Sequence, residues 1–97
     1  MATFVSLVGW TERGVQNFKD TVARADAAAA AAEKMGGRIK DIYWTVGSYD
    51  IVVVGELGDD ETGTAFLLAL GSMGNVRTNT LRAFDKDEMA DIIAKAG

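Results

Sequence analysis

The stretch Ile51-Val52-Val53-Val54 decides how this sequence folds. A β-strand with one face in water alternates apolar and polar residues, because successive side chains point to opposite faces. These four residues are apolar at every position, so both faces of the strand must be covered. The segment Phe4-Val5-Ser6-Leu7-Val8 has a similar character. Since a chain of 97 residues has too few helices to cover a sheet twice, we expect a second copy of the chain to supply the other cover.

Length and composition indicate one globular domain spanning residues 1–97. Hydrophobic residues make up 48% and charged residues 25% of the chain, which is typical of a packed core with a soluble surface. Fourteen acidic and 10 basic residues give a net charge of −4, which argues against nucleic acid or an anionic membrane as a partner. No stretch is long enough to span a bilayer, and residues 1–4 lack the features of a signal peptide. We therefore expect a cytoplasmic protein.

Histidine and cysteine are both absent from the sequence. Their absence removes the commonest metal ligand, the usual neutral-pH acid–base group, every disulfide and every thiolate nucleophile. We therefore expect no metal, no redox centre and no cofactor. The one dense acidic run, Asp59-Asp60-Glu61, stands directly before a helical pattern. We interpret it as a helix cap rather than a metal site, because acidic residues stabilise helix N-termini.

Periodicity and turn residues divide the chain into alternating strands and helices. We expect a helical region from residue 11 or 12 to about 35, with a kink near Asp20-Thr21, and a two-residue hairpin turn at Gly47-Ser48. Asp85 and Glu88 have the spacing of a capping box, which predicts a short helix at the end of the chain. The strands are expected at residues 3–10, 38–46, 49–56 and 76–84, a second helix at 60–73, and the apolar face of the first helix at Val15, Phe18, Val22, Ala25, Ala29 and Ala32.

The order of these elements predicts an α+β fold of the ferredoxin-like βαββαβ type, followed by a C-terminal helix. Right-handed crossovers give an antiparallel four-stranded sheet in the spatial order 4-1-3-2, with the two most apolar strands in the centre. Both long helices then cover the same face of the sheet, and the terminal helix is too short to cover the other. We expect two sheets to pack face to face in a homodimer, as in a dimeric α+β barrel, or in a higher homo-oligomer.

Several motifs of the chain resemble the GYD-domain family of small bacterial and archaeal proteins. The signature Gly, Tyr, Asp is matched by Gly47, Tyr49 and Asp50, and the similarity extends over nearly the whole chain. The resemblance implies the dimeric α+β barrel superfamily and no established activity. The stretches that carry it are residues 8–12, 43–54, 71–78 and 80–84.

The predicted topology brings one end of the first strand next to the starts of the third and fourth. Asp50 and Arg77 would stand two strands apart, roughly 10 Å across the sheet, and in position to clamp a small polar or anionic ligand. Each residue also has a structural interpretation: the aromatic rings pack near the hairpin, and Asp50 caps the turn. The predicted ligand-binding residues are Trp10, Tyr49, Asp50, Asn75 and Arg77.

Three functional classes remain open on the sequence alone. The first is a small-ligand-binding or sensing domain that acts as a homodimer, and the strand-end residues favour it. The second is a structural protein whose exposed edge strands join dimers into larger assemblies. The third is a cofactor-independent isomerase or monooxygenase-like enzyme that uses Asp50 or Tyr49 in proton transfer. The third class rests on fold analogy alone, so we rank ligand binding first.

Overall fold

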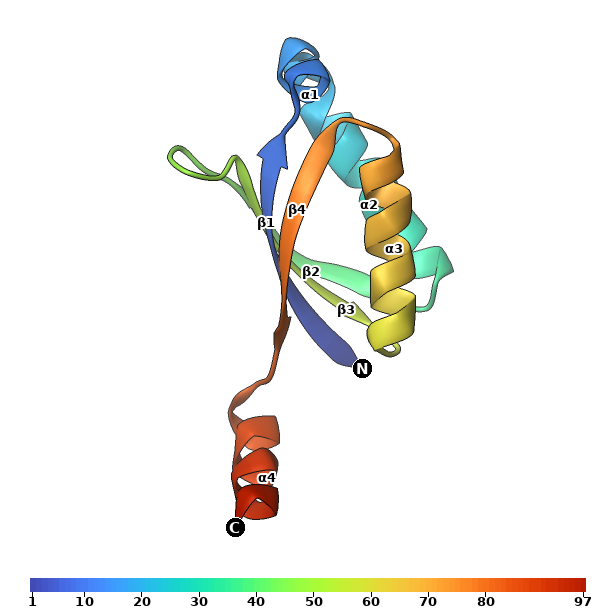
Figure 1. Ribbon diagram of the computed structural model, residues 1–97. Coiled ribbons are helices and arrows are strands. Elements are labelled where there is room, and N and C mark those ends of the chain that lie inside the picture. Colours follow the sequence, from blue (N-terminus) through green and yellow to red (C-terminus); the bar gives the residue numbers. More distant parts are fainter.

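The computed structural model describes all residues from 1 to 97 and contains one four-stranded antiparallel sheet. Two long helices, α2 and α3, lie side by side over one face of this sheet (Figure 1). The α+β fold and its order of elements are confirmed. The elements are β1 (Ala2–Trp10), α1 (Glu12–Gln16), η1 (Phe18–Asp20), α2 (Thr21–Lys34), β2 (Arg38–Trp44), β3 (Ile51–Leu57), α3 (Asp60–Ser72), β4 (Val76–Ala83) and α4 (Lys86–Ala96).

The strands lie in the order β2-β3-β1-β4, which is the predicted order read from the other edge. The two most apolar strands are therefore central, as the sequence indicated. In the register of β1 with β3, Val8 pairs with Ile51 and Ser6 with Val53 on the face toward the helices. The neighbouring pair Val5 and Val54 belongs to the opposite face.

The predicted break in the first helical region is confirmed by the 3₁₀ turn η1, which separates α1 from α2. The predicted apolar face was wrong in its first half, since Val15, Phe18 and Val22 are 47%, 53% and 58% exposed. A 3₁₀ turn has 3.0 residues per turn instead of 3.6, so a spacing that is continuous in the sequence is not continuous around the axis. Asp20 does not cap α2 through its side chain.

The predicted caps of the later helices are confirmed. The backbone N–H of Thr62 donates to Asp59 Oδ1 over 2.7 Å, and this hydrogen bond lowers the pKa of the Asp59 carboxyl. Asp85 and Glu88 form the reciprocal capping box that begins α4. At the end of α3, Gly74 has φ of +82°, a conformation that favours glycine and ends the helix. The acidic run at residues 59–61 thus supplies a cap.

The connection between β2 and β3 is longer than the expected two-residue turn. Pairing stops at Trp44 and Ile51, and residues 45–50 extend as a loop away from the helices (Figure 1). The reason lies in β1: Asp50 N–H donates to Val8 O over 2.8 Å, so this residue is held by the neighbouring strand. Gly47, at φ of +139°, supplies the bend at the tip.

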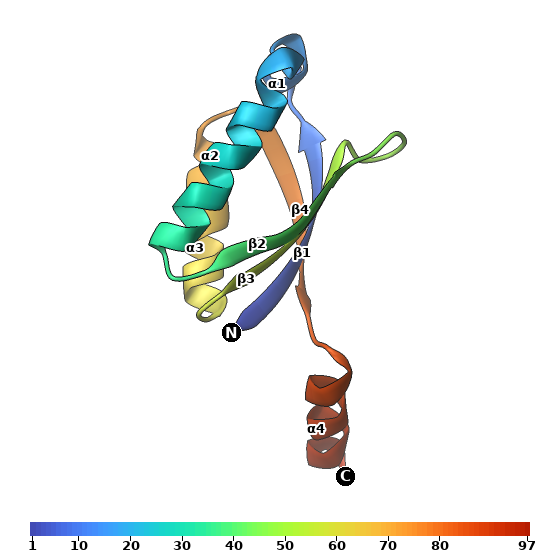
Figure 2. The same cartoon turned by 180° about the vertical axis from the view of Figure 1, so that it is seen from behind.

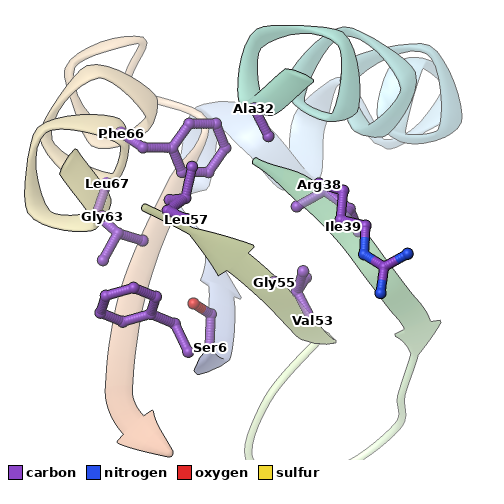
Figure 3. A pocket seen from close by; sticks show the side chains of 11 residues that line it. Ser6, Ala32, Arg38, Ile39, Val53, Gly55, Leu57, Gly63, Phe66 and Leu67 are labelled. Atoms are coloured by element: carbon purple, nitrogen blue, oxygen red, sulfur yellow. The ribbon is translucent and has the colours of Figure 1, made fainter. Parts of the chain in front are cut away.

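The core between helices and sheet is thin. Ala32 of α2, Leu57 of β3 and Phe66 of α3 form its buried cluster, and Phe4 and Ile39 pack against it. Figure 3 shows these side chains around a pocket below the two helices, with the Arg38 guanidinium turned away from it. Because α2 presents alanines to the sheet, few side chains reach across the layer.

The opposite face of the sheet is covered by no helix of this chain (Figures 1 and 2). We call it the open face. Its register positions include the apolar residues Val5, Leu7, Val52, Val54 and Leu81. The terminal helix α4 stands away from the sheet at the far end of β4 and has no buried residue (Figure 2). No helix of the chain is long and apolar enough to cross a membrane.

Candidate functional site

Asp50 joins the hairpin loop to the end of β1. Its carboxylate Oδ2 accepts a hydrogen bond from the backbone N–H of Trp10 over 2.8 Å, while its own N–H donates to Val8 O. A carboxylate that accepts a backbone N–H makes a charge-assisted bond, which is stronger than a neutral one. Asp50 therefore fixes the position of the loop that carries Tyr49 relative to β1.

Tyr49 extends from this loop across the open face. Its hydroxyl accepts a hydrogen bond from Asn79 Nδ2 of β4 over 3.2 Å. Since β1 lies between β3 and β4, the Tyr49 side chain must pass over β1 to reach Asn79. Asn79 pairs with Leu7, an open-face position, so this contact stands on the face without helices.

Arg77 stands on the same face, two residues before Asn79 on β4 and opposite Gly9 of β1. Its side chain is exposed and belongs to neither of the two ion pairs of the molecule, Arg38–Glu56 and Arg82–Asp60. The position that a Cβ of Gly9 would take has no atom within 4 Å. Tyr49, Asn79 and Arg77 thus surround bare backbone, and we call these three residues with Gly9 the strand-end cluster.

Trp10 and Asn75 lie on the other side of the sheet end. Trp10 has the same parity as Val8, which faces the helices, and its indole lines a cavity together with Ala25 and Ala28 of α2. The carbonyl of Asn75 accepts the N–H of Thr11 over 3.1 Å, and the residue lines the groove between α2 and α3. The five predicted site residues therefore share one end of the sheet but are distributed over its two faces.

Asn79 was not among the predicted site residues. The signal for it was available, because alternate residues of a strand share a face and Arg77 had already been selected. Chemically, the cluster offers a guanidinium, an amide and a hydroxyl within one exposed region. These are the donors that hold carboxylates and other small anions.

The geometry defines a small ferredoxin-like α+β domain with one uncovered sheet face and a polar cluster at the end of that face. The chain belongs to the GYD domain family, whose model matches residues 4–93. This family membership confirms the resemblance that the signature residues indicated.

Two proteins of Thermus thermophilus are similar to the chain. One, described as a glutamine synthetase and cystathionine beta-lyase binding protein, is 33% identical over 96 residues, which cover 98% of each chain. The other is the crystal structure of TTHA0845, with a TM-score of 0.56 and 25% identity over 88% of this chain and 95% of that one.

Proposed function

We propose that this protein is a non-catalytic binding module that acts as a homodimer joined through the open face. The proposal is supported by the apolar residues of both central strands on a face that no helix covers, among them Val5, Leu7 and Val54. Buried apolar surface stabilises by about 25 cal/mol per Å², and a standard interface buries about 1,600 Å². A four-stranded sheet face paired with its own copy satisfies that requirement without further elements.

Within this dimer, the strand-end cluster binds a small polar or anionic ligand, so that the module acts as a sensor. The observation that carries this proposal is the unpaired Arg77 beside the Tyr49–Asn79 hydrogen bond and the bare backbone of Gly9. Asp50 positions the loop through its bond to the Trp10 N–H. This engagement makes a positioning role a better account of Asp50 than proton transfer, so we rank binding above catalysis. Trp10 and Asn75 support the cluster from the other face.

Two measurements test this function. Sedimentation at micromolar concentration should find a dimer, and a clean monomer would overturn the proposed assembly. A thermal-shift screen with small carboxylates and amino acids should then find compounds that stabilise the wild-type protein more than the Arg77→Ala variant.

Arg13→Ala is the matched control for that screen, because Arg13 is also exposed and has no ion pair. A lost charge-assisted contact costs about 1.5–3 kcal/mol, or roughly ten-fold or more in affinity. If no compound distinguishes Arg77→Ala from Arg13→Ala, the cluster is not a ligand site.

A second candidate function is the binding of a metabolic enzyme. It is favoured by the description of the Thermus relative, and by an apolar patch outside the dimer face: Val15, Phe18 and Val22 are 47%, 53% and 58% exposed along α1, η1 and α2. Exposed patches of this kind often mark protein contacts. We further propose a cytoplasmic location, where such enzymes work.

The enzyme-binding function predicts that immobilised protein captures glutamine synthetase or cystathionine beta-lyase from the same organism. Phe18→Glu should abolish the capture and leave the dimer intact. Leu68→Glu, at another exposed apolar residue on α3, should change neither property. Equal capture by both variants would exclude the patch as the contact surface.

A further inference from the structure

The layer between α2 and the sheet is incompletely filled. The residues that α2 presents to the sheet are alanines, and Ser6 and Gly55 below them are also small. A cavity of about 250 Å³ remains between Ala28, Val53 and Leu70, and it opens beside Asp26 and Lys40 at the β2 edge. A dry apolar cavity of about 150 Å³ is already large enough to bind benzene. The interlayer space therefore has the size and the walls of a small-molecule site.

A smaller chamber of about 70 Å³ continues this space toward the end of β1. The two share Val8, Ala28, Val53 and Leu70 among their lining residues, and the smaller one ends at Trp10, Thr21 and Arg24. We call the two together the interlayer cavity. It lies on the helix side of the sheet, whereas the strand-end cluster lies on the open face.

Polar groups gather at the Trp10 end of this otherwise apolar space. Trp10 Nε1 is the one buried side-chain nitrogen or oxygen of the molecule without a hydrogen-bond partner. A buried donor left unpaired is costly, so each such group in a structure needs a reason. The indole lacks an acceptor that the protein itself does not supply.

Arg24 brings a positive charge to the same end. Its guanidinium donates to the carbonyls of Asn17 over 2.8 Å and Gly14 over 3.2 Å, and it forms no ion pair. Thr21 accepts a hydrogen bond from Trp44 Nε1 over 3.0 Å, which leaves its own hydroxyl proton free to donate. Three donors and one uncompensated cation thus stand at one end of an apolar cavity.

We propose that the interlayer cavity binds a small carboxylic acid with an apolar body, such as a medium-chain fatty acid. The apolar body replaces the missing side chains between α2 and the sheet. A small rotation of the Trp10 ring into the chamber lets the carboxylate accept from Nε1, with Thr21 and Arg24 as the other donors. A concave apolar site with a few convergent polar groups is the usual form of a ligand pocket. The site does not depend on the dimer or on the strand-end cluster.

The experiment compares two probes with the same chain and opposite head groups, decanoate and decylammonium, below their micelle concentrations. The protein has a net charge of −4, so unspecific attraction favours the cation. We expect decanoate to bind one per chain and at least ten-fold more tightly than decylammonium. Equal binding of both, or no binding of decanoate to the wild type, would overturn the proposal.

Variants then locate the site. Ala28→Leu fills the cavity and should reduce decanoate affinity at least ten-fold, whereas Ala30→Leu, on the exposed side of α2, should leave it unchanged. Trp10→Phe should remove most of the preference for the anion. In ¹H–¹⁵N spectra, decanoate should move the Nε1–H signal that Trp10→Phe deletes and leave that of Trp44 near its place. Unchanged affinity in both Ala28→Leu and Trp10→Phe, or an unmoved Trp10 signal, would contradict the assignment.

Discussion

The face of the sheet under α2 and α3 buries Val8 and Ile51, whereas the opposite face, with Val5 and Val54 at its centre, is covered by no element of the chain. The covered face nevertheless contains the hollow layer, because its helix contributes alanines. The open face has the larger aliphatic side chains and no cover. Coverage and filling are therefore separate properties of a sheet, and in this molecule each face has only one of them.

The difference suggests that each face is completed from outside the chain in its own way. The open face needs an apolar surface as broad as a sheet, which a second copy provides. The covered face needs only a small apolar body. The four substitutions below, from the largest expected effect to the smallest, test whether the two faces behave independently.

Val54→Lys should have the largest effect, because it puts a charge at the centre of the open face. Desolvating an unpaired ammonium costs several kcal/mol, so we expect the dimer to dissociate into folded monomers at micromolar concentration. Val46→Lys is the control, since Val46 lies fully exposed in the hairpin loop. Sedimentation gives the assembly state and circular dichroism the fold. A Val54→Lys protein that stays dimeric would place the interface elsewhere.

Gly14→Ala should destabilise the fold by about 1–3 kcal/mol, because a Cβ at this position would meet the carbonyl oxygen of Asn75 at 1.9 Å. Backbone cannot move aside as a flexible side chain can. Gly9→Ala has nothing within 4 Å and should leave the free energy of unfolding unchanged or raise it by about 0.4–1 kcal/mol. Urea unfolding measures both. Similar losses in the two variants would mean that the open-face end is not bare.

Ala28→Leu should stabilise the ligand-free protein by about 0.5–2 kcal/mol, since it fills the space between α2 and the sheet. Ala30→Leu, which adds the same atoms to the exposed side of the helix, should change stability by less than about 0.5 kcal/mol. The melting temperatures of both variants, measured without ligand, check this prediction. A clear loss of stability in Ala28→Leu would show that the layer is already filled.

Glu56→Gln should have the smallest effect and should depend on pH. Arg38 Nε donates to Glu56 Oε1 over 2.7 Å at the border of the open face, and this bond lowers the pKa of the Glu56 carboxyl. A carboxyl with a depressed pKa stabilises the fold above its unfolded pKa of about 4.3, and this contribution disappears as the pH falls through the folded value.

The wild type should therefore be slightly more stable than Glu56→Gln at pH 7, and the difference should vanish in acid. Unfolding curves recorded between pH 7 and pH 3 measure it. Arg38→Gln removes the other partner and should remove the same acid-side dependence. A difference that persists at pH 3 would point to packing instead of charge.

The sequence was sufficient to predict the elements, the strand order and the caps at Asp59 and Asp85, because all of these depend on local pattern and on the handedness of crossovers. It did not predict which side of the sheet each site residue occupies. Strand parity places Trp10 with Val8, but the chain leaves the strand pattern at Asp50, so parity says nothing about Tyr49. The hollow under α2 was equally hidden, since alanines predict a helix and do not reveal how far the sheet lies below it.

Helix α4 has a consequence for the exchange of amide hydrogens. It has 11 residues, a capping box at Asp85 and no buried side chain. Isolated helices shorter than about 12–15 residues are marginal in water, so α4 opens without unfolding the sheet. In a monomer, the amides of residues 86–96 therefore exchange with deuterium long before those of β1 and β3. Protection of these amides that grows with protein concentration would identify the surface of a second molecule as the place where the helix settles.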